Sequence, residues 1–338
     1  MSRYLYWLCT ALAGSKALGE TLDRYGNAKA VYDAVECDIA MPAALKNRLK
    51  STPFGADLPE GVSVVVKGSK DYPAALAKYD DSPRVLFYSG DLSLLEENAV
   101  GIVGTRYADD YGLAVTKMYA GHLADMGRVI AGGVALGVET TAFKEALSRG
   151  GRCIAVLPCG INRITPASNY ALMEKIVAQG GLVLSALAPD VPVLQGAYHQ
   201  RGRLMAMCMR SLLVTQCGVA GGVHITVGHV KNQGKTVYAV PARIGSEKTS
   251  GTNLLIKEGA AITTDPTDFG KINETKKHTP LTGDEKIIYD LICQGYTDSA
   301  VLMDVCGMLP QRTMQILSVL ENGGYITYTS GGSYMPTV

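Results

Sequence analysis

Hydrophobic side chains follow three different patterns along the 338 residues of the chain. In residues 1–60 they recur every three or four positions, which is the spacing of one face of an α-helix. The residues in that register are Tyr4, Leu5, Leu8, Leu12, Leu18, Leu22 and Tyr25. Gly14 and Gly26 separate the helical stretches, so this part is predicted to be a domain of several short helices.

Residues 61–270 alternate between short apolar runs and longer amphipathic stretches. The runs have the length of strands and are apolar throughout, which is typical of strands buried on both faces of a parallel sheet. They lie at 62–66, 84–90, 99–104, 128–133, 152–158, 181–187, 211–216 and 235–242. Because strand–helix–strand units wind a sheet in both directions, we expect an α/β, Rossmann-like, doubly wound and mostly parallel sheet.

The last part of the chain changes character again. Residues 271–280 are polar and are predicted to be a linker, and residues 281–338 show three helical stretches followed by two short strand-like runs. That order is typical of a winged-helix domain. This segment carries six acidic residues and only two basic ones, Lys286 and Arg312, a balance that opposes phosphate binding. We therefore expect a domain for protein interaction or packing rather than a DNA reader.

Charge is distributed unevenly, although the net charge is only +1. Residues 191–246 contain no acidic residue, against 31 in the whole chain. The same stretch carries basic side chains at Arg201, Arg203, Arg210, Lys231, Lys235 and Arg243. Such a stretch creates a local positive potential, which favours an anionic ligand.

The eight cysteines form no recognisable metal or redox motif, because none stands in a Cys-x-x-Cys pair. Several, such as Cys9 and Cys153, lie within apolar runs and are interpreted as reduced core residues. No apolar run reaches the ~18–20 residues of a membrane span, and the N-terminus lacks the features of a signal peptide. The sequence thus favours a cytoplasmic protein with no membrane partner, and it indicates no metal site and no cofactor.

In a doubly wound fold, ligands bind where the strands end. The first candidate there is Gly104-Thr105-Arg106, which ends an apolar strand before a helix. Unpaired N–H groups at helix starts attract anions, and an arginine adds a bidentate phosphate contact. The glycine patterns of dinucleotide-binding and P-loop sites are missing. Taken alone, the motif is also compatible with an ordinary strand–turn–helix and a solvated arginine.

The second candidate is the glycine pair Gly132-Gly133, which follows another strand and precedes Glu139. Paired glycines expose backbone N–H groups that can cradle a phosphate. Glu139 has the chemistry of a general base, but no His, Cys or Ser nucleophile accompanies it in the sequence. The alternative interpretation is that this carboxylate balances the dipole of the helix that it begins.

The third candidate, residues 198–203 (YHQRGR), lies inside the acid-free stretch. Two arginines beside aromatic rings offer charge and a stacking surface, which is the chemistry of single-strand binding. An ordinary basic loop is the alternative. His224 and His229 are five residues apart, whereas a metal pair on one helix face needs a spacing of three or four.

These motifs, in this order, resemble the DNA-processing protein A (DprA/Smf) family. The matching stretches are VGTR (103–106), AGGVALGVE (131–139), IAVLPCGIN (154–162), YHQRGRL (198–204), GGVHIT (221–226), VPA (240–242) and GTNLLIKEGA (251–260). Each motif is short, but seven in register are specific. The resemblance covers residues 65–330, and the whole chain matches the family's plan of an N-terminal SAM-like helical domain, a Rossmann-like domain and a winged-helix domain.

The resemblance implies a protein without catalytic residues that binds single-stranded DNA, protects incoming DNA during natural transformation and helps to load the RecA recombinase as a homodimer. It places nucleic-acid contacts on motif residues, namely Gly104, Thr105, Arg106, Gly132, Gly133, Arg201 and Arg203. Phe143 and Lys144, in the helix after the glycine pair, are added as a stacking ring beside a cation.

The sequence departs from the family pattern at several motif positions. Ala131 replaces a serine, Glu139 an aspartate, Gly202 an asparagine and Gln216 a glutamate. A lost hydrogen bond is worth ~0.5–1.5 kcal/mol, whereas the retained arginines carry most of the electrostatic affinity. Two alternatives stay open. One is a sensor that binds a small nucleotide; the other is a nucleotide-hydrolysing enzyme related to phosphoribohydrolases, whose Gly-Thr after the glycine pair is missing here.

Overall fold

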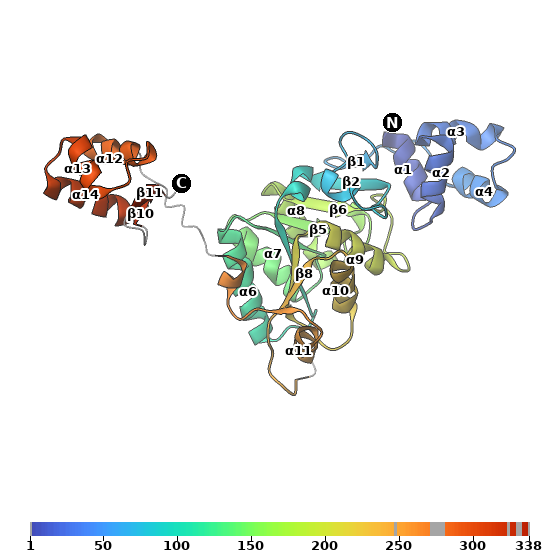
Figure 1. The fold of residues 1–338 in the computed structure, drawn as a ribbon. Helices are drawn as coiled ribbons and strands as arrows, with labels where there is room; N and C mark the ends of the chain where they lie inside the picture. The colour runs from blue at the N-terminus through green and yellow to red at the C-terminus, as the bar shows by residue number, and fades with distance from the viewer. Residues whose placement is uncertain (1, 247–248, 271–280, 323–324, 329–332, 337–338) are drawn as a thin grey trace. The chain divides into compact units, whose positions relative to one another are not determined.

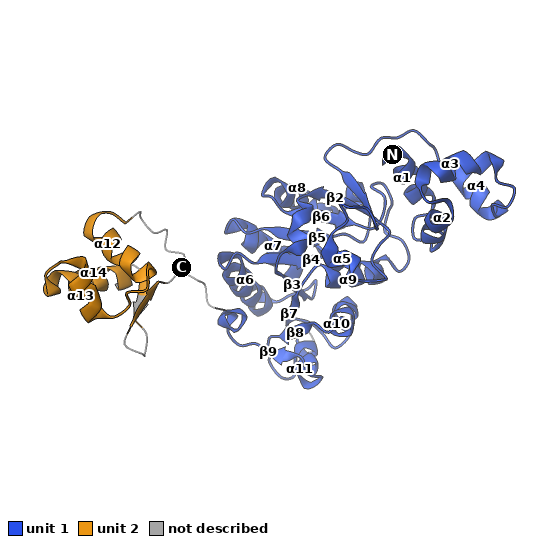
Figure 2. Ribbon diagram, turned by 45° about the horizontal axis from the view of Figure 1, so that its top comes forward, with its two compact units in different colours: residues 1–272 blue, residues 273–338 orange. Residues whose placement is uncertain are grey.

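The computed structural model describes residues 2–246, 249–270, 281–322, 325–328 and 333–336. The chain forms two compact units, Met1–Ile272 and Asn273–Val338 (Figure 2). The predicted linker at 271–280 lies outside the described residues.

The first unit begins with four short helices. They are α1 (Ser2–Ala11), α2 (Ala17–Tyr25), α3 (Ala28–Cys37) and α4 (Ala43–Ser51) (Figure 1). Asn27 starts α3, because its side chain accepts a hydrogen bond from the N–H of Ala30. The apolar faces of these helices share one buried cluster with Phe87 and Leu187 of the sheet region. The predicted N-terminal helical segment therefore packs directly on the rest of its unit.

A nine-stranded sheet forms the centre of this unit, in the order β1-β2-β6-β5-β4-β3-β7-β8-β9. Its strands are β1 (Ser63–Val66), β2 (Val85–Gly90), β3 (Ala99–Gly104), β4 (Val129–Gly132), β5 (Cys153–Val156), β6 (Leu182–Ser185), β7 (Ser211–Gln216), β8 (Thr236–Ala239) and β9 (Ala261–Ile262). Neighbours from β6 to β9 are parallel, whereas β1 and β2 join antiparallel. The predicted α/β, mostly parallel sheet is confirmed, and β9 is a strand that the pattern did not predict.

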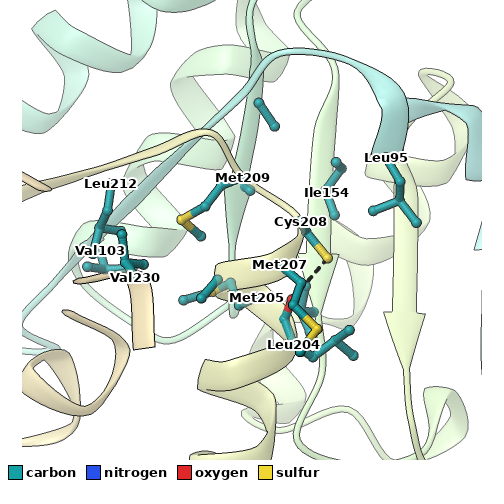
Figure 3. Packing of buried hydrophobic residues seen from close by; sticks show 14 of the residues in the cluster. Leu95, Val103, Ile154, Leu204, Met205, Met207, Cys208, Met209, Leu212 and Val230 are labelled. Atoms are coloured by element: carbon teal, nitrogen blue, oxygen red, sulfur yellow. Dashed lines mark hydrogen bonds between the residues drawn. The ribbon is translucent and has the colours of Figure 1, made fainter. Parts of the chain in front are cut away.

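Helices cover both faces of the sheet. They are α5 (Ala74–Ala77), α6 (Asp110–Asp125), α7 (Val138–Ser148), α8 (Tyr170–Ala178), α9 (Ala197–Met207), α10 (Gly222–Asn232) and α11 (Ser250–Lys257), with 3-10 turns η1 (Leu92–Glu96), η2 (Ile161–Arg163), η3 (Ala167–Asn169) and η4 (Pro266–Phe269). Successive residues of a strand point to opposite faces. Accordingly, Val103 belongs to the cluster with α9, α10 and α11, and Ile102 to the cluster with α6, α7 and α8. Figure 3 shows the first cluster, in which the end of α9 supplies Met205, Met207 and the following Cys208 and Met209.

The order of the strands fixes where a ligand can bind. From β3 the chain proceeds through β4 and β5 to β6 on one side, and then returns to place β7 and β8 on the other side of β3. The winding therefore reverses between β3 and β7. At such a switch point the loops leave in opposite directions and open a crevice at the carboxyl ends of the strands.

The second unit contains three helices and a strand pair. These are α12 (Gly283–Cys293), α13 (Ser299–Cys306), α14 (Pro310–Asn322), β10 (Ile326–Tyr328) and β11 (Tyr334–Pro336), and the two strands are antiparallel. Ile288, Leu302, Leu317 and Tyr334 contribute to its small core. The order of elements is the one expected for a winged helix, and that assignment stays a prediction. Within the described parts of both units, no helix is long and apolar enough to cross a membrane.

Candidate nucleic-acid interface

A pocket of about 530 Å³ opens at the switch point between β3 and β7. Its wall comes from the loops that follow these two strands, from the start of α7 and from α9 and α10. The lining residues are Val103, Gly104, Thr105, Arg106, Tyr107, Ala135, Glu139, Tyr198, Arg201, Cys217, Gly218, Ala220, Gly221, Gly222, Val223, Ile225 and Thr226. The pocket thus lies where the sequence predicted a ligand site.

The loop after β3 is held tightly against its neighbours. A Cβ atom on Gly104 would lie 2.5 Å from Val138 Cγ2 and 2.6 Å from the carbonyl oxygen of Gln216, so only glycine fits there. Thr105 N–H donates to that same carbonyl at 2.8 Å, and Thr105 O accepts from Val138 N–H at 3.3 Å. These contacts fix the backbone from which the exposed side chain of Arg106 departs.

Two arginines converge on one aromatic ring in this pocket. Arg106 Cζ lies 5.5 Å from the centroid of the Tyr198 ring, and Arg201 Cζ lies 6.0 Å from it. A guanidinium at that distance from a tyrosine face is attracted by about 0.5–1 kcal/mol. The ring therefore attracts both guanidinium groups. The arrangement gives an anion two donors and gives a flat base a partner for stacking.

The glycine pair forms its loop around a carboxylate of the same chain. Glu139 is 5% exposed, and its Oε2 accepts hydrogen bonds from Gly133 N–H at 3.1 Å and Ala135 N–H at 2.7 Å. Its Oε1 lies 3.7 Å from Arg201 Nη1. The loop turns at Val134 with φ of 65°, an uncommon conformation for a β-branched residue. The Gly133 N–H predicted for a phosphate is thus already used, and Glu139 does more than balance the dipole of α7.

The structure separates the residues that the sequence grouped together. Gly104, Thr105, Arg106 and Arg201 line the pocket. Gly132 and Gly133 are buried behind it. Arg203 instead lies 3.1 Å from Asp81 and lines another hollow, because residues two apart on a helix point in different directions. Residues 198–203 lie in helix α9, so the alternative of an ordinary basic loop is wrong.

The role expected for Phe143 is wrong. Its ring is 1% exposed and packs against Gly132, where a Cβ atom would lie 3.1 Å from Phe143 Cζ. It is a core residue because it faces the sheet from α7, so it has no free face for a base. Lys144 is exposed on the same helix but does not line the pocket.

Two features of the pocket were not among the predicted contact residues, although one of them lies in the matched motif at 221–226. Tyr107 directly follows the first motif and is 81% exposed. Gly221 and Gly222 open helix α10 toward the pocket, and no side chain caps this helix start. A helix N-terminus carries a positive partial charge that attracts anions. The signal was present in the sequence, since a glycine pair follows β7 just as a glycine follows β3.

Both histidines discussed for metal binding have partners within the protein. His224 Nε2 lies 2.8 Å from Gly218 O and ties down the loop after β7. His229 Nε2 lies 3.3 Å from His199 Nδ1. Burial, and then the neighbouring His199, lower the pKa of His229.

The chemistry of the pocket favours the binding of an anion over nucleophilic catalysis. Its charged lining residues among those described are Arg106, Arg201 and Glu139, which leaves one net positive charge. Cys217 is the thiol in the wall, and burial raises its pKa to about 12, so it stays protonated and a poor nucleophile. Together with the helix start of α10, this pocket suits a phosphate-bearing ligand.

A mostly parallel, nine-stranded sheet with a pocket at its switch point defines an α/β protein of the doubly wound, Rossmann-like class. Within this class, the chain belongs to the DNA recombination-mediator protein A family, whose model matches residues 63–273. The family resemblance seen in the sequence is confirmed.

Relatives and solved structures agree with this assignment. Protein Smf of Escherichia coli (strain K12) is 30% identical over 280 residues, covering 78% of this chain and 75% of the relative. DNA processing protein DprA of Streptococcus pneumoniae is 33% identical over 198 residues, covering 58% and 69%. The structure of the Streptococcus pneumoniae protein superimposes with a TM-score of 0.65 at 25% identity, covering 80% of this chain and 98% of that one. The structure of DNA processing protein A from Helicobacter pylori, described by its unique single-stranded DNA binding mode, superimposes with a TM-score of 0.56 at 30% identity. This match covers 64% of this chain and 96% of that one.

Proposed function

We propose that the pocket between β3 and β7 binds single-stranded DNA, with Arg106 and Arg201 as its cationic contacts. The observation that carries the proposal is the convergence of both guanidinium groups on the Tyr198 ring, 5.5 Å and 6.0 Å from its centroid. Single-strand binders combine basic groups for the backbone with aromatic faces for the bases. Thr105 and the start of α10 add neutral donors for a phosphate.

The wider role follows from the family. We propose that the protein acts in the cytoplasm as a homodimer, protects single strands that enter during natural transformation, and helps to load RecA. We also propose that it does so without catalysis. Two observations support this: the Cys217 thiol has a pKa raised to about 12, and both carboxylate oxygens of Glu139 already face internal partners. Neither group is free to attack a ligand or to take a proton from water.

A small nucleotide is the second candidate ligand. The pocket volume of about 530 Å³ falls in the range of small-molecule sites. A nucleotide signal would use the same arginines but would need no further contacts outside the pocket.

Fluorescence anisotropy with a labelled oligo-dT tests the proposal. The wild type should bind at low salt and lose affinity as salt rises, with a slope of about −0.7 per phosphate contacted. Arg106→Ala/Arg201→Ala should lose most of this binding. Arg128→Ala is the matched control, because Arg128 directly precedes β4. It therefore lies at the amino ends of the parallel strands, whereas the pocket lies at their carboxyl ends. No binding of the wild type at low salt would overturn the DNA proposal, and thermal shifts with nucleotides would then test the second candidate.

Recombinase loading needs its own assay. In the presence of a single-strand-binding protein, the wild type should speed up the assembly of RecA filaments on a long single strand. Arg106→Ala/Arg201→Ala should fail to do so. An unchanged assembly rate with the DNA-binding wild type would remove RecA from the proposal and leave DNA binding in place.

A further inference from the structure

A second hollow lies beside the first one, on the other side of the loop that follows β3. It measures about 870 Å³ and is lined by Asp109, Tyr111, Arg243, Ile244, Gly245, Ser246 and Thr249. Tyr107, from the same loop, lines the first pocket. One short stretch of chain thus supplies side chains to both hollows.

The residues directly after β8 that form the far wall are held by their neighbours. Asn253 holds the backbone of Ala242 from both sides, because its Oδ1 accepts from Ala242 N–H and its Nδ2 donates to Ala242 O, each at 2.9 Å. Thr249 Oγ1 donates to Arg243 O at 3.3 Å. The position of the Arg243 backbone is therefore set, while its side chain is exposed.

The near wall is fixed as well. Gln216 accepts from Asp109 N–H at 3.1 Å and donates to Asp109 Oδ1 at 2.7 Å. That same Oδ1 accepts from Gly112 N–H at 2.9 Å, at the start of α6. The hydroxyl of Tyr111 reaches across the hollow to Pro241 O at 3.5 Å. Both walls are thus held in place before any ligand arrives, which lowers the entropic cost of binding.

The side chains that face this hollow suit a nucleotide unit. Tyr111 is 52% exposed and Ile244 is 92% exposed, so each presents an apolar surface to water. Arg243 adds a cation. Asp109 and the exposed Asp110 beside it oppose a run of phosphates, although two donors of the protein already occupy Oδ1 of Asp109. This balance favours one stacked base with one phosphate contact over an extended backbone track.

We propose that this hollow is a second subsite for the same single strand, in which a base stacks on Tyr111 and the adjoining phosphate contacts Arg243. The strand would pass from the first pocket over Tyr107, whose exposed ring lies on the loop shared by the two sites. This inference rests on the proposed DNA binding at the first pocket and adds a path for the strand beyond it.

A length series of oligo-dT separates the two subsites. Wild-type affinity should rise from the shortest oligonucleotides that bind and then level off once both subsites are filled. Tyr111→Ala/Arg243→Ala should match the wild type at the shortest lengths and stay about 5- to 10-fold weaker at the longest, as expected for one lost base stack. Its salt slope with long strands should fall by about 0.7. The controls are Tyr170→Ala, whose ring is 53% exposed and lines another pocket, and Arg128→Ala.

Crosslinking gives a measurement that needs no variant. A strand that carries 5-iodouracil should form photoadducts on Tyr111 of the full-length wild type. Equal affinity of Tyr111→Ala/Arg243→Ala and wild type at every length, with no such adduct, would overturn the second subsite while Arg106→Ala/Arg201→Ala still abolished binding. An equal loss at every length, the shortest included, would also overturn it, because the residues would then belong to the first site. Failure of the wild type to bind any length would instead remove the proposed function itself.

Discussion

Glu139 and Arg201 face each other in the wall of the pocket, with 3.7 Å between Oε1 of the carboxylate and Nη1 of the guanidinium. Both side chains are mostly buried. Arg201 Nε is buried without a hydrogen-bond partner among the described residues. A cation in such a place needs its counter-charge. The pair therefore links the stability of the pocket wall to its capacity for anions.

Glu139→Ala should destabilise the protein. It leaves the N–H groups of Gly133 and Ala135 without their acceptor and Arg201 without its counter-charge, at a cost of about 2–4 kcal/mol in the free energy of unfolding. Glu139→Gln keeps an acceptor oxygen and should cost less. Urea denaturation measures both. Glu145→Ala, on the outer side of the same helix, is the control and should cost under about 1 kcal/mol. Similar losses at positions 139 and 145 would contradict this account.

Glu139→Gln should also tighten binding to DNA. It removes the one negative charge among the described lining residues and so raises the net charge of the pocket from +1 to +2. We expect a several-fold gain in oligo-dT affinity at low salt that fades at high salt, because screening weakens the added attraction. Unchanged or weaker binding in the anisotropy assay would show that the carboxylate positions Arg201 productively rather than opposing the ligand.

Two glycine substitutions should differ in whether they affect mainly DNA affinity or mainly stability. In Gly133→Ala the new Cβ would lie 1.1 Å from Arg201 Nη1, the mobile end of a side chain, so Arg201 should move at a modest cost in stability. In Gly160→Ala it would lie 2.1 Å from Ala188 O, which is backbone. We expect Gly133→Ala to lose DNA affinity with a smaller loss of stability than Gly160→Ala, which should unfold more easily by about 3 kcal/mol. Anisotropy measures the affinity and urea denaturation the stability of each variant. A larger loss of stability in Gly133→Ala than in Gly160→Ala would contradict the prediction.

Gln216→Glu would restore the carboxylate that the family has at this position. Here it would face Asp109, whose Oδ1 now accepts from Gln216 Nε2 at 2.7 Å. Two carboxylates at this distance repel, so we expect a loss of about 1–3 kcal/mol at neutral pH. Adding Asp109→Asn should recover part of the lost stability, because an amide can donate a hydrogen bond to the new glutamate. Thermal unfolding of the single and double variants is the measurement, and absence of recovery would argue against the Gln216–Asp109 contact.

Lys235 should make stability depend on pH. Burial lowers its pKa from 10.5 to about 8, and its Nζ donates to Ala206 O. Between these pH values the unfolded chain binds more protons than the folded one, so this lysine makes stability rise with pH across the window. Cys208 and other buried thiols, with pKa values raised to about 12, act in the opposite direction above pH 9. The difference between wild type and Lys235→Met isolates the lysine, and a difference that stays constant from pH 7 to 10 would contradict the prediction.

The sequence predicted the sheet well because its strands are continuous apolar runs that are long enough for a buried strand and too short for a buried helix. β9 escaped because two residues, Ala261 and Ile262, carry no pattern. Motif spacing located the first pocket, since strand ends must gather at one edge of a parallel sheet.

The direction of individual side chains could not be predicted in the same way. Arg201 and Arg203 look equivalent in the sequence, and only the helical path of α9 sends one to the pocket and the other to Asp81. Phe143 looks exposed beside Lys144, but the register of α7 turns it inward. The second hollow has no motif at all, because its residues come from loops whose meeting depends on the completed fold.

The first pocket is built from loops after β3 and β7, between which the chain lays down β4, β5 and β6. A growing chain therefore has no binding site until β7 has been made and has reached its place beside β3. A DNA strand that enters this pocket contacts both halves of the sheet, namely the half that ends at β3 and the half that begins at β7. Because DNA would bind only the assembled sheet, it would stabilise the folded protein against separation of these halves by mass action.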